Sequence, residues 1–111
     1  MGSKENSYYI KKAQEDINAI IEYTRGVTFE EFVIDIKTID AVMFRLVQLI
    51  ESIKNISDEY KEIHQEIPWG NIVGFRNRIV HEYGKTDYTT VYEIVSSDIY
   101  QLKSLFETND Q

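Results

Sequence analysis

The sequence contains no cysteine, a single proline and no long apolar run. Without cysteine, the 111-residue chain can form no disulfide and offers no thiol for zinc binding or nucleophilic catalysis. One proline and five glycines leave few turn-forming residues, which argues against a loop-rich or disordered chain. No stretch approaches the roughly 20 apolar residues that a membrane helix needs, and no signal peptide is visible. We therefore expect a soluble, cytoplasmic protein that does not enter a membrane.

Positive charge is also scarce. The chain has 12 Lys and Arg residues against 19 Asp and Glu residues, which gives a net charge of −7. This balance argues against a broad nucleic-acid-binding surface. The segment from Pro68 to Lys85 is the exception, because it contains Arg76, Arg78 and Lys85 but only one acidic residue, Glu82. Any contact with a phosphate backbone is therefore expected at this segment.

Apolar residues recur at helical spacing through most of the chain, and neither strand-like alternation nor an internal repeat is present. The spacing predicts helices over residues 7–25, 36–56 and 87–106, with a short capped piece at 28–33 and an acidic, solvated helical arm at 57–66. The clearest pattern is that of Ile36, Ile39, Met43, Leu46, Ile50 and Ile53. We predict a single domain over residues 1–111 that folds as an all-α, four-to-five-helix, up-and-down bundle.

The segment from Pro68 to Tyr83 predicts one further helix of about 16 residues, which Gly84 would cap. Projected at about 100° per residue, this helix has a broad apolar face and an opposite line of small and polar residues. That line, here called the glycine seam, consists of Gly70, Gly74, Asn77 and His81. Each interior glycine costs about 1 kcal/mol relative to alanine, so a close contact with another backbone is expected to offset the cost. The seam therefore predicts homodimerisation.

Two side chains of this segment have the chemistry of an active site. His81 could donate or accept a proton near neutral pH, although a histidine near a helix end is also an ordinary partner of the helix dipole. Arg76 projects into the apolar face, where a guanidinium must be paired, reach solvent or border a cleft. It could bind phosphate oxygens, or it could form a buried ion pair for which Asp40 is the candidate partner. The histidines and acidic residues do not have metal-site spacing, so no metal is expected.

The run Arg76-Asn77-Arg78-Ile79-Val80-His81-Glu82-Tyr83 resembles the Arg-x-x-x-x-His-x-Tyr signature of the HEPN-domain toxins called HepT. Further matches are Ile67-Pro68-Trp69, Asp87-Tyr88, Tyr23-Thr24-Arg25-Gly26 and Phe29-Glu30-Glu31-Phe32. The resemblance implies a HEPN bundle that dimerises with its motif helices close together and forms a composite cleft. On a straight helix Arg76 and His81 would diverge by about 140°. They could therefore meet only if the helix is distorted, the arginine reaches around it, or two subunits pool residues.

By this resemblance, the chain is expected to be the toxin of a toxin–antitoxin pair and a metal-independent endoribonuclease. A ribose 2′-hydroxyl would attack the adjacent phosphodiester, so the nucleophile belongs to the RNA and no cofactor is needed. His81 would shuttle the proton, Arg76 would hold the phosphate, and Asn77 would orient the substrate or the imidazole. Arg78 and Lys85, otherwise ordinary surface charges, are candidates for positioning the RNA backbone.

The resemblance also implies a partner, a minimal nucleotidyltransferase antitoxin that attaches AMP to Tyr83. Judged by spacing alone, Tyr83 is the aromatic end of the apolar face. A function of another class stays open, in which the chain is a non-catalytic binding subunit that serves only as the AMP acceptor of the nucleotidyltransferase. The acidic composition favours that alternative. A purely structural helical dimer is a third possibility, but it leaves Arg76, Asn77 and His81 unexplained.

Overall fold

The computed structural model describes residues 3–80 and 86–108, and this part of the chain is largely helical. Two long helices, α1 (Ser3–Thr24) and α3 (Ile36–Lys54), are joined by the short α2 (Phe29–Phe32). Three short helices follow, α4 (Asp58–Ile63), α5 (Trp69–Val73) and α6 (Phe75–Ile79). The last helical segment consists of α7 (Tyr88–Glu93), the one-turn π-helix η2 (Ile94–Asp98), here called the π-turn, and α8 (Ile99–Thr108). These ranges contain no β-strand, which confirms the predicted all-α fold.

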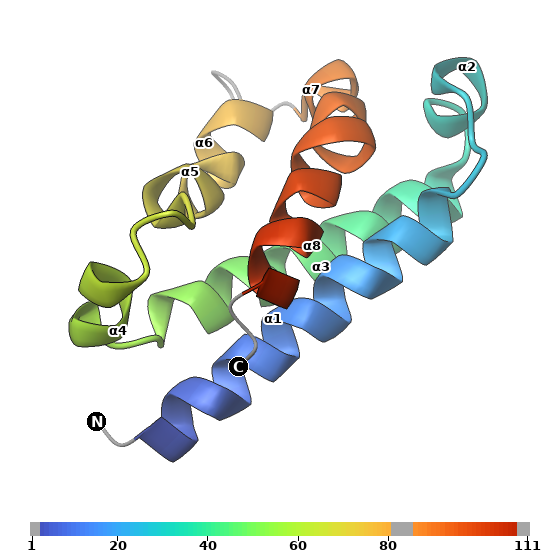
Figure 1. Ribbon diagram of the computed structural model, residues 1–111. Coiled ribbons are helices and arrows are strands. Elements are labelled where there is room, and N and C mark those ends of the chain that lie inside the picture. The colour runs from blue at the N-terminus through green and yellow to red at the C-terminus, as the bar shows by residue number, and fades with distance from the viewer. Residues whose placement is uncertain (1–2, 81–85, 109–111) are drawn as a thin grey trace.

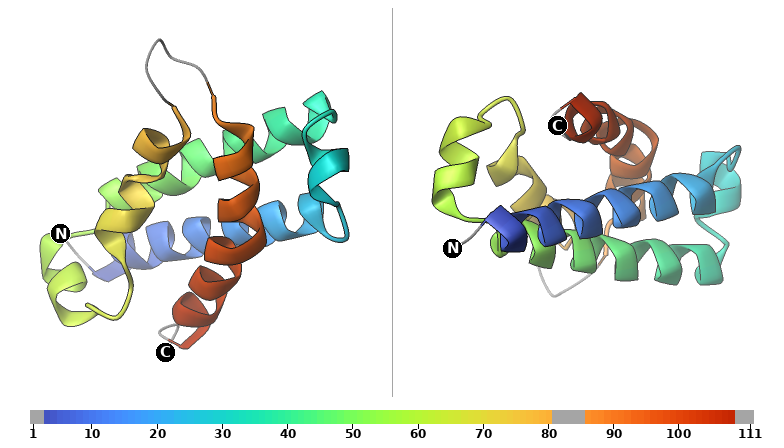
Figure 2. Two further views of the ribbon diagram at one scale, coloured as in Figure 1. Left: turned by 90° about the horizontal axis from the view of Figure 1, so that it is seen from above. Right: turned by 60° about the horizontal axis from the view of Figure 1, so that its bottom comes forward.

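The helices form two layers. Helices α1 and α3 lie side by side and run in opposite directions (Figure 1). The α5–α6 segment packs on α3, whereas α8 packs on α1 (Figure 1). Figure 2 shows from above that both of these segments cross the α1–α3 pair. The end of α6 is joined to the residues before α7. Val80 forms an isolated antiparallel bridge with Thr86, and the Asp87 amide donates to the Ile79 carbonyl oxygen at 2.6 Å.

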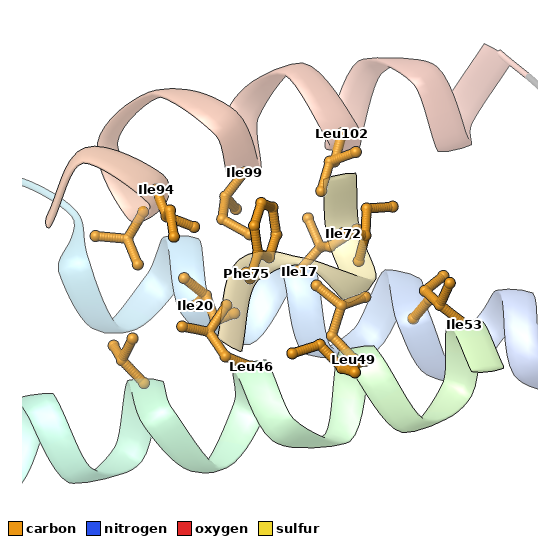
Figure 3. Packing of buried hydrophobic residues seen from close by; sticks show 14 of the residues in the cluster. Ile17, Ile20, Leu46, Leu49, Ile53, Ile72, Phe75, Ile94, Ile99 and Leu102 are labelled. Carbon is orange, nitrogen blue, oxygen red and sulfur yellow. The ribbon is translucent and has the colours of Figure 1, made fainter. Parts of the chain in front are cut away.

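One apolar cluster fills the space between the two layers (Figure 3). The apolar side chains of the predicted pattern on α3 are buried or half-buried except Ile36, which is exposed. The buried apolar residues of α1 recur at helical spacing and are Ile10, Ala13, Ile17, Ile20 and Ile21. Full burial of one such side chain contributes about 1.5–3 kcal/mol, so this cluster is the main source of stability. Its centre includes Ile17, Ile20, Leu46, Leu49, Ile53, Ile72, Phe75, Ile94, Ile99 and Leu102.

Local sequence signals at the helix ends are confirmed. Thr28 and Glu31 form the predicted capping box, in which Thr28 Oγ1 accepts from the Glu31 amide at 3.2 Å and Glu31 Oε1 accepts from the Thr28 amide at 2.9 Å. Asp87 caps α7 by accepting from the Thr90 amide at 3.1 Å. Gly26 follows the end of α1 with a φ of +72°, a conformation that glycine adopts without strain.

A buried ion pair joins the two long helices. Asp16 of α1 is fully buried, and its Oδ1 accepts a hydrogen bond at 3.0 Å from Nη1 of Arg45 on α3. The second oxygen, Oδ2, has no hydrogen-bond partner among the described residues. Burial raises the pKa of the Asp16 carboxyl. Arg45 also donates from Nε to the Tyr23 hydroxyl at 3.3 Å, so one guanidinium holds two side chains of α1.

A second polar contact joins the start of α1 to the start of α4. The Asn6 side chain donates to Ser57 Oγ at 3.0 Å and accepts from the Ser57 backbone N–H at 3.0 Å. Ser57 Oγ in turn accepts from the Tyr60 amide at 3.2 Å, which makes Ser57 the N-cap of α4. The cap of α4 therefore depends on a residue that lies 51 positions earlier in the chain.

Candidate active site

The segment predicted as one helix from residue 68 to residue 83 is divided in the structure. Helix α5 ends at Val73, Gly74 is its C-cap, and α6 runs from Phe75 to Ile79. Val80 is extended, with a φ of −102° and a ψ of 112°. The prediction of one continuous helix is therefore wrong, and the helical projection that placed His81 on the glycine seam does not apply to it.

Glycine fits the break at Gly74, because a β-carbon there would lie only 3.2 Å from the Gly70 carbonyl oxygen. The two short helices share a buried face, formed by Ile72, Phe75 and Ile79, and this burial holds them because helices of five residues are not stable alone. At Gly70, in contrast, a β-carbon would meet no described atom within 4 Å. Packing among the described residues therefore does not explain that glycine.

Arg76 is exposed on α6 and lies where two hollows meet. The first hollow is an apolar cleft of about 210 Å³ between α3 and α6, here called the Arg76 cleft. Besides Arg76, it is lined by Met43, Leu46, Val47, Ile50, Ile79 and Val80. The second hollow, of about 300 Å³, adds the charged residues Glu51 and Lys54 to Val47, Ile50 and Arg76. Of the three possibilities predicted for this arginine, the structure shows an exposed side chain that borders a cleft.

Arg76 has no side-chain hydrogen bond or ion pair within residues 3–80 and 86–108. Asp40, its candidate partner, is exposed on α3 and forms no ion pair with Arg76. The structure does not bring Asp40 and Arg76 together. The exposure of Arg76 also excludes a buried ion pair, and its guanidinium remains available to an anion.

The two residues after Arg76 differ in their surroundings. Asn77 is exposed on α6. Arg78 is held, because its Nη1 donates to Oδ2 of Asp98 at 2.8 Å and its guanidinium carbon lies 5.8 Å from the centre of the Phe75 ring. The structure therefore links Arg78 to the last helical segment, which makes it a weaker candidate for contacting an RNA backbone.

The predicted site residues His81, Tyr83 and Lys85 lie outside the described residues. Val80, which precedes His81 in the chain, lines the Arg76 cleft. The chain on the other side of the undescribed stretch returns to the same place, because Thr86 bridges to Val80.

Sequence reasoning did not single out Glu51, Lys54 or Asp98. Glu51 and Lys54 follow Val47 at intervals of four and three residues, so helical spacing contained the signal that they share one face of α3. For Asp98 there was no such signal. A π-turn changes which way the following side chains point, and the apolar spacing of the last helix does not reveal it.

The cleft has the chemistry of a site for an anion with apolar attachments. An arginine can form two parallel hydrogen bonds to phosphate oxygens. Lys54 adds a second positive charge in the adjoining hollow, while the aliphatic walls can contact a sugar or a base. The fold and the cleft together define a small helical domain with a cleft that an exposed arginine borders.

Comparison with known proteins identifies the family to which this domain belongs. The profile of the family described as "Ribonuclease HepT-like" matches residues 13–108. The chain therefore belongs to the HepT-like ribonuclease family, as the motif resemblance predicted, and this membership supports endoribonuclease activity.

Individual relatives agree with this assignment. A protein named "Probable ribonuclease HepT" from Thermococcus cleftensis is 37% identical over 99 residues, which cover 89% of this chain and 90% of that protein. A "Putative RNase" from Caldanaerobacter subterraneus subsp. tengcongensis is 30% identical over 95 residues, covering 86% of this chain and 85% of the relative. A second "Putative RNase", from Methanocaldococcus jannaschii, is 29% identical over 108 residues, which cover 96% of this chain and 98% of that relative. No solved structure matches the chain significantly. None of the described helices is both long and apolar enough to cross a membrane.

Proposed function

We propose that this protein is a metal-independent endoribonuclease that acts in the cytoplasm and cleaves RNA at the Arg76 cleft. The observation that carries the proposal is an exposed Arg76, with no side-chain partner among the described residues, at an apolar cleft in a member of a ribonuclease family. The 2′-oxygen forms a bond to phosphorus, the bond from phosphorus to the 5′-oxygen breaks, and a 2′,3′-cyclic phosphate results. The 2′-hydroxyl proton passes to a base, and the leaving 5′-oxygen receives a proton.

The proposed roles follow from the chemistry of each side chain. Arg76 binds the non-bridging phosphate oxygens and stabilises the negative charge that develops on them in the transition state. His81, a residue type that can both accept and donate a proton, takes the proton from the 2′-hydroxyl and delivers it to the leaving oxygen. Asn77, exposed on α6, orients the substrate or the imidazole. The nucleophile is part of the substrate, so the step as written requires no metal or cofactor.

We also propose that the active form is a homodimer. The predicted divergence of Arg76 and His81 applied to a continuous helix, so the end of α6 at Ile79 removes that reason for a composite site. Other observations support the dimer. Gly70 leaves open space on an exposed face. On α3, the side chain of Phe44 is 59% exposed, and that of Val47, which lines the cleft, is 50% exposed. Apolar surface of this kind beside a site is typical of a subunit interface.

The proposed regulation follows the family resemblance. The chain would be the toxin of a toxin–antitoxin pair, and a minimal nucleotidyltransferase antitoxin would attach AMP to Tyr83. The added phosphodiester and its bulk would oppose entry of a polyanionic RNA. The second candidate function, a non-catalytic AMP acceptor, is favoured by the net charge of −7, because an acidic surface repels RNA.

Cleavage of RNA by purified variants separates these functions. We expect wild type to cleave total RNA in the presence of EDTA, and His81→Ala and Arg76→Ala to lose at least about 10²-fold in rate. Because Arg76 is exposed and pairs with none of the described residues, Arg76→Ala should keep the helical CD spectrum. Arg25→Ala is the matched control, because Arg25 is a surface arginine whose ion pair with nearby Glu22 is exposed. Equal cleavage by wild type and His81→Ala would reveal a contaminant and refute the assignment. A wild type that does not cleave but accepts AMP would favour the second function.

The dimer and the modification have separate tests. Light scattering should give a dimer for wild type and a monomer for Phe44→Asp, and a monomeric wild type at micromolar concentration would exclude the dimer. Incubation with the cognate nucleotidyltransferase and ATP, followed by mass spectrometry, should place AMP on Tyr83 and leave Tyr83→Phe unmodified. AMP on another residue, or equal modification of Tyr83→Phe, would contradict the proposed switch.

A further inference from the structure

We propose that Asp98 is a positioning residue for the motif segment and acts through Arg78. The inference rests on the proposed function, since the residue that it positions, Arg76, is the proposed phosphate ligand. Asp98 belongs to a different helical segment and does not line the Arg76 cleft.

The first observation is that α6 has few means of fixing its own orientation. It has five residues, and Gly74 before it provides no side-chain cap. Phe75 and Ile79 bury one face, and the Val80–Thr86 bridge and the hydrogen bond from the Asp87 amide to the Ile79 carbonyl oxygen hold the end of the helix. The remaining rotation about the buried face is limited by side-chain contacts at its edge. Arg78 supplies such a contact, because its guanidinium lies between the Asp98 carboxylate, at 2.8 Å, and the Phe75 ring, at 5.8 Å.

The second observation is the π-turn from Ile94 to Asp98. A π-turn contains one residue more than an α-helical turn, so it rotates the following side chains by about 100° relative to an uninterrupted helix. Ile94 and Val95 remain buried, and Ser96 Oγ donates to the Tyr92 carbonyl oxygen at 2.7 Å. Asp98 is the last residue of the turn. Its direction toward α6 is therefore a product of the irregular turn, and such turns occur frequently at functional sites.

Arg76 and the chain beyond it move together with Arg78. Arg76 lies two residues earlier on the same short helix, on the side that faces α3. Its carbonyl oxygen accepts from the Val80 amide at 2.9 Å, and Val80 is where the chain becomes extended and continues toward His81. The Asp98–Arg78 pair thus sets the rotation of α6, and through it both the Arg76 guanidinium and the direction in which the chain leaves the helix.

Arg78 could instead contact the RNA backbone directly. That competing role predicts the opposite effect of Asp98→Asn on kcat/KM. Asp98→Asn removes the carboxylate that holds Arg78 and keeps the shape of the side chain. If Arg78 were an RNA contact, its release would strengthen binding and lower KM with little change in kcat. If Asp98 positions the segment, kcat falls by roughly tenfold to a hundredfold, because a misplacement of about 1 Å can cost that much, and KM stays within about twofold.

The experiment compares Asp98→Asn with Glu107→Gln in the cleavage of one oligoribonucleotide. Glu107 is the matched control, because it accepts from Lys103 at 2.7 Å in an exposed ion pair on the adjoining α8. Asp98→Glu keeps the charge but changes the reach, so it should give a kcat between those of wild type and Asp98→Asn. Hydrogen exchange of the Arg78 and Val80 amides gives a readout independent of activity. Both should exchange about fivefold faster in Asp98→Asn, which corresponds to about 1 kcal/mol, and at the wild-type rate in Glu107→Gln.

Each outcome decides the proposal. A fall in kcat at constant KM, partly restored in Asp98→Glu, supports it. An unchanged kcat, or a lower KM at constant kcat, overturns it. If wild type cleaves no RNA, the proposed function fails on its own, and exchange at Arg78 and Val80 then decides whether Asp98 anchors α6. If Asp98→Asn does not fold, Asp98→Glu carries the test, and wild-type kcat in that variant refutes the positioning role.

Discussion

Replacing Arg45 with alanine should destabilise the protein, and the loss should grow as the pH rises. Arg45 donates the hydrogen bond that Asp16 accepts at 3.0 Å, and Asp16 is fully buried with its second oxygen unpartnered among the described residues. Without the guanidinium, the carboxyl group must stay charged without a partner or take up a proton. Burial already raises its pKa above 3.8, and loss of the Arg45 hydrogen bond raises the pKa further.

The sign and the size of the effect follow from this shift. An acid with a raised pKa in the folded state contributes fully to stability below 3.8, its ordinary value, and loses that contribution as the pH rises through the folded-state pKa. Each pH unit in this interval costs about 1.4 kcal/mol, so the variant loses at most about 4 kcal/mol between pH 4 and pH 7. That limit agrees with the roughly 3–5 kcal/mol that breaking a buried ion pair costs. Near pH 4 the stability that Arg45→Ala still loses comes mainly from the lost packing of the aliphatic part of the arginine side chain.

Urea denaturation followed by CD, at about pH 4 and about pH 7, measures this difference. Arg25→Ala is the control, because its ion pair with Glu22 joins side chains that are 68% and 70% exposed. That variant should stay within about 0.5 kcal/mol of wild type at both pH values. An Arg45→Ala penalty that is independent of pH, or no larger than that of Arg25→Ala, would refute the reasoning.

Three further substitutions test local features by thermal denaturation. Gly70→Ala, made in the Phe44→Asp background so that a subunit contact does not contribute, should raise stability by up to about 1 kcal/mol, because the position is helical and a β-carbon there meets no described atom within 4 Å; a lower melting temperature would contradict that open space. Gly26→Ala should cost about 1 kcal/mol, since φ is +72° there, and a neutral result would contradict that strain. Phe75→Ala should cost about 3–5 kcal/mol by opening a cavity under α6, and a cost below 1 kcal/mol would mean that Phe75 does not hold the segment.

Sequence reasoning predicted the long helices well, because their apolar residues recur over many turns. In α1 and α3 the periodic signal is averaged over about five turns, so a single deviation such as the exposed Ile36 does not obscure it. The capping residues Thr28 and Asp87 were also predictable, since a cap depends only on neighbours three residues away.

The motif segment was predicted less well, for physical reasons. A helical projection assumes constant geometry, so it cannot detect a break at Gly74 or an early end at Ile79, both of which depend on packing against α3 and the last helix. The same limit concealed the π-turn. Val91, Val95 and Ile99 follow each other at intervals of four, which an α-helix accommodates almost as well. The identity of Arg76 was predictable from the motif, whereas its cleft, made with residues of α3, was not.

The cap that Asn6 provides to Ser57 has a consequence for the order in which the molecule folds. Contacts between residues far apart in sequence form only after the intervening chain has been brought together, and this one spans 51 positions. Helix α4 should therefore gain its cap only once α1 and α3 have paired. Helices α5 and α6, each of five residues, also depend on contacts with that pair. The segment that carries Arg76 should accordingly be among the last parts to form during refolding and among the first to open when the protein is destabilised.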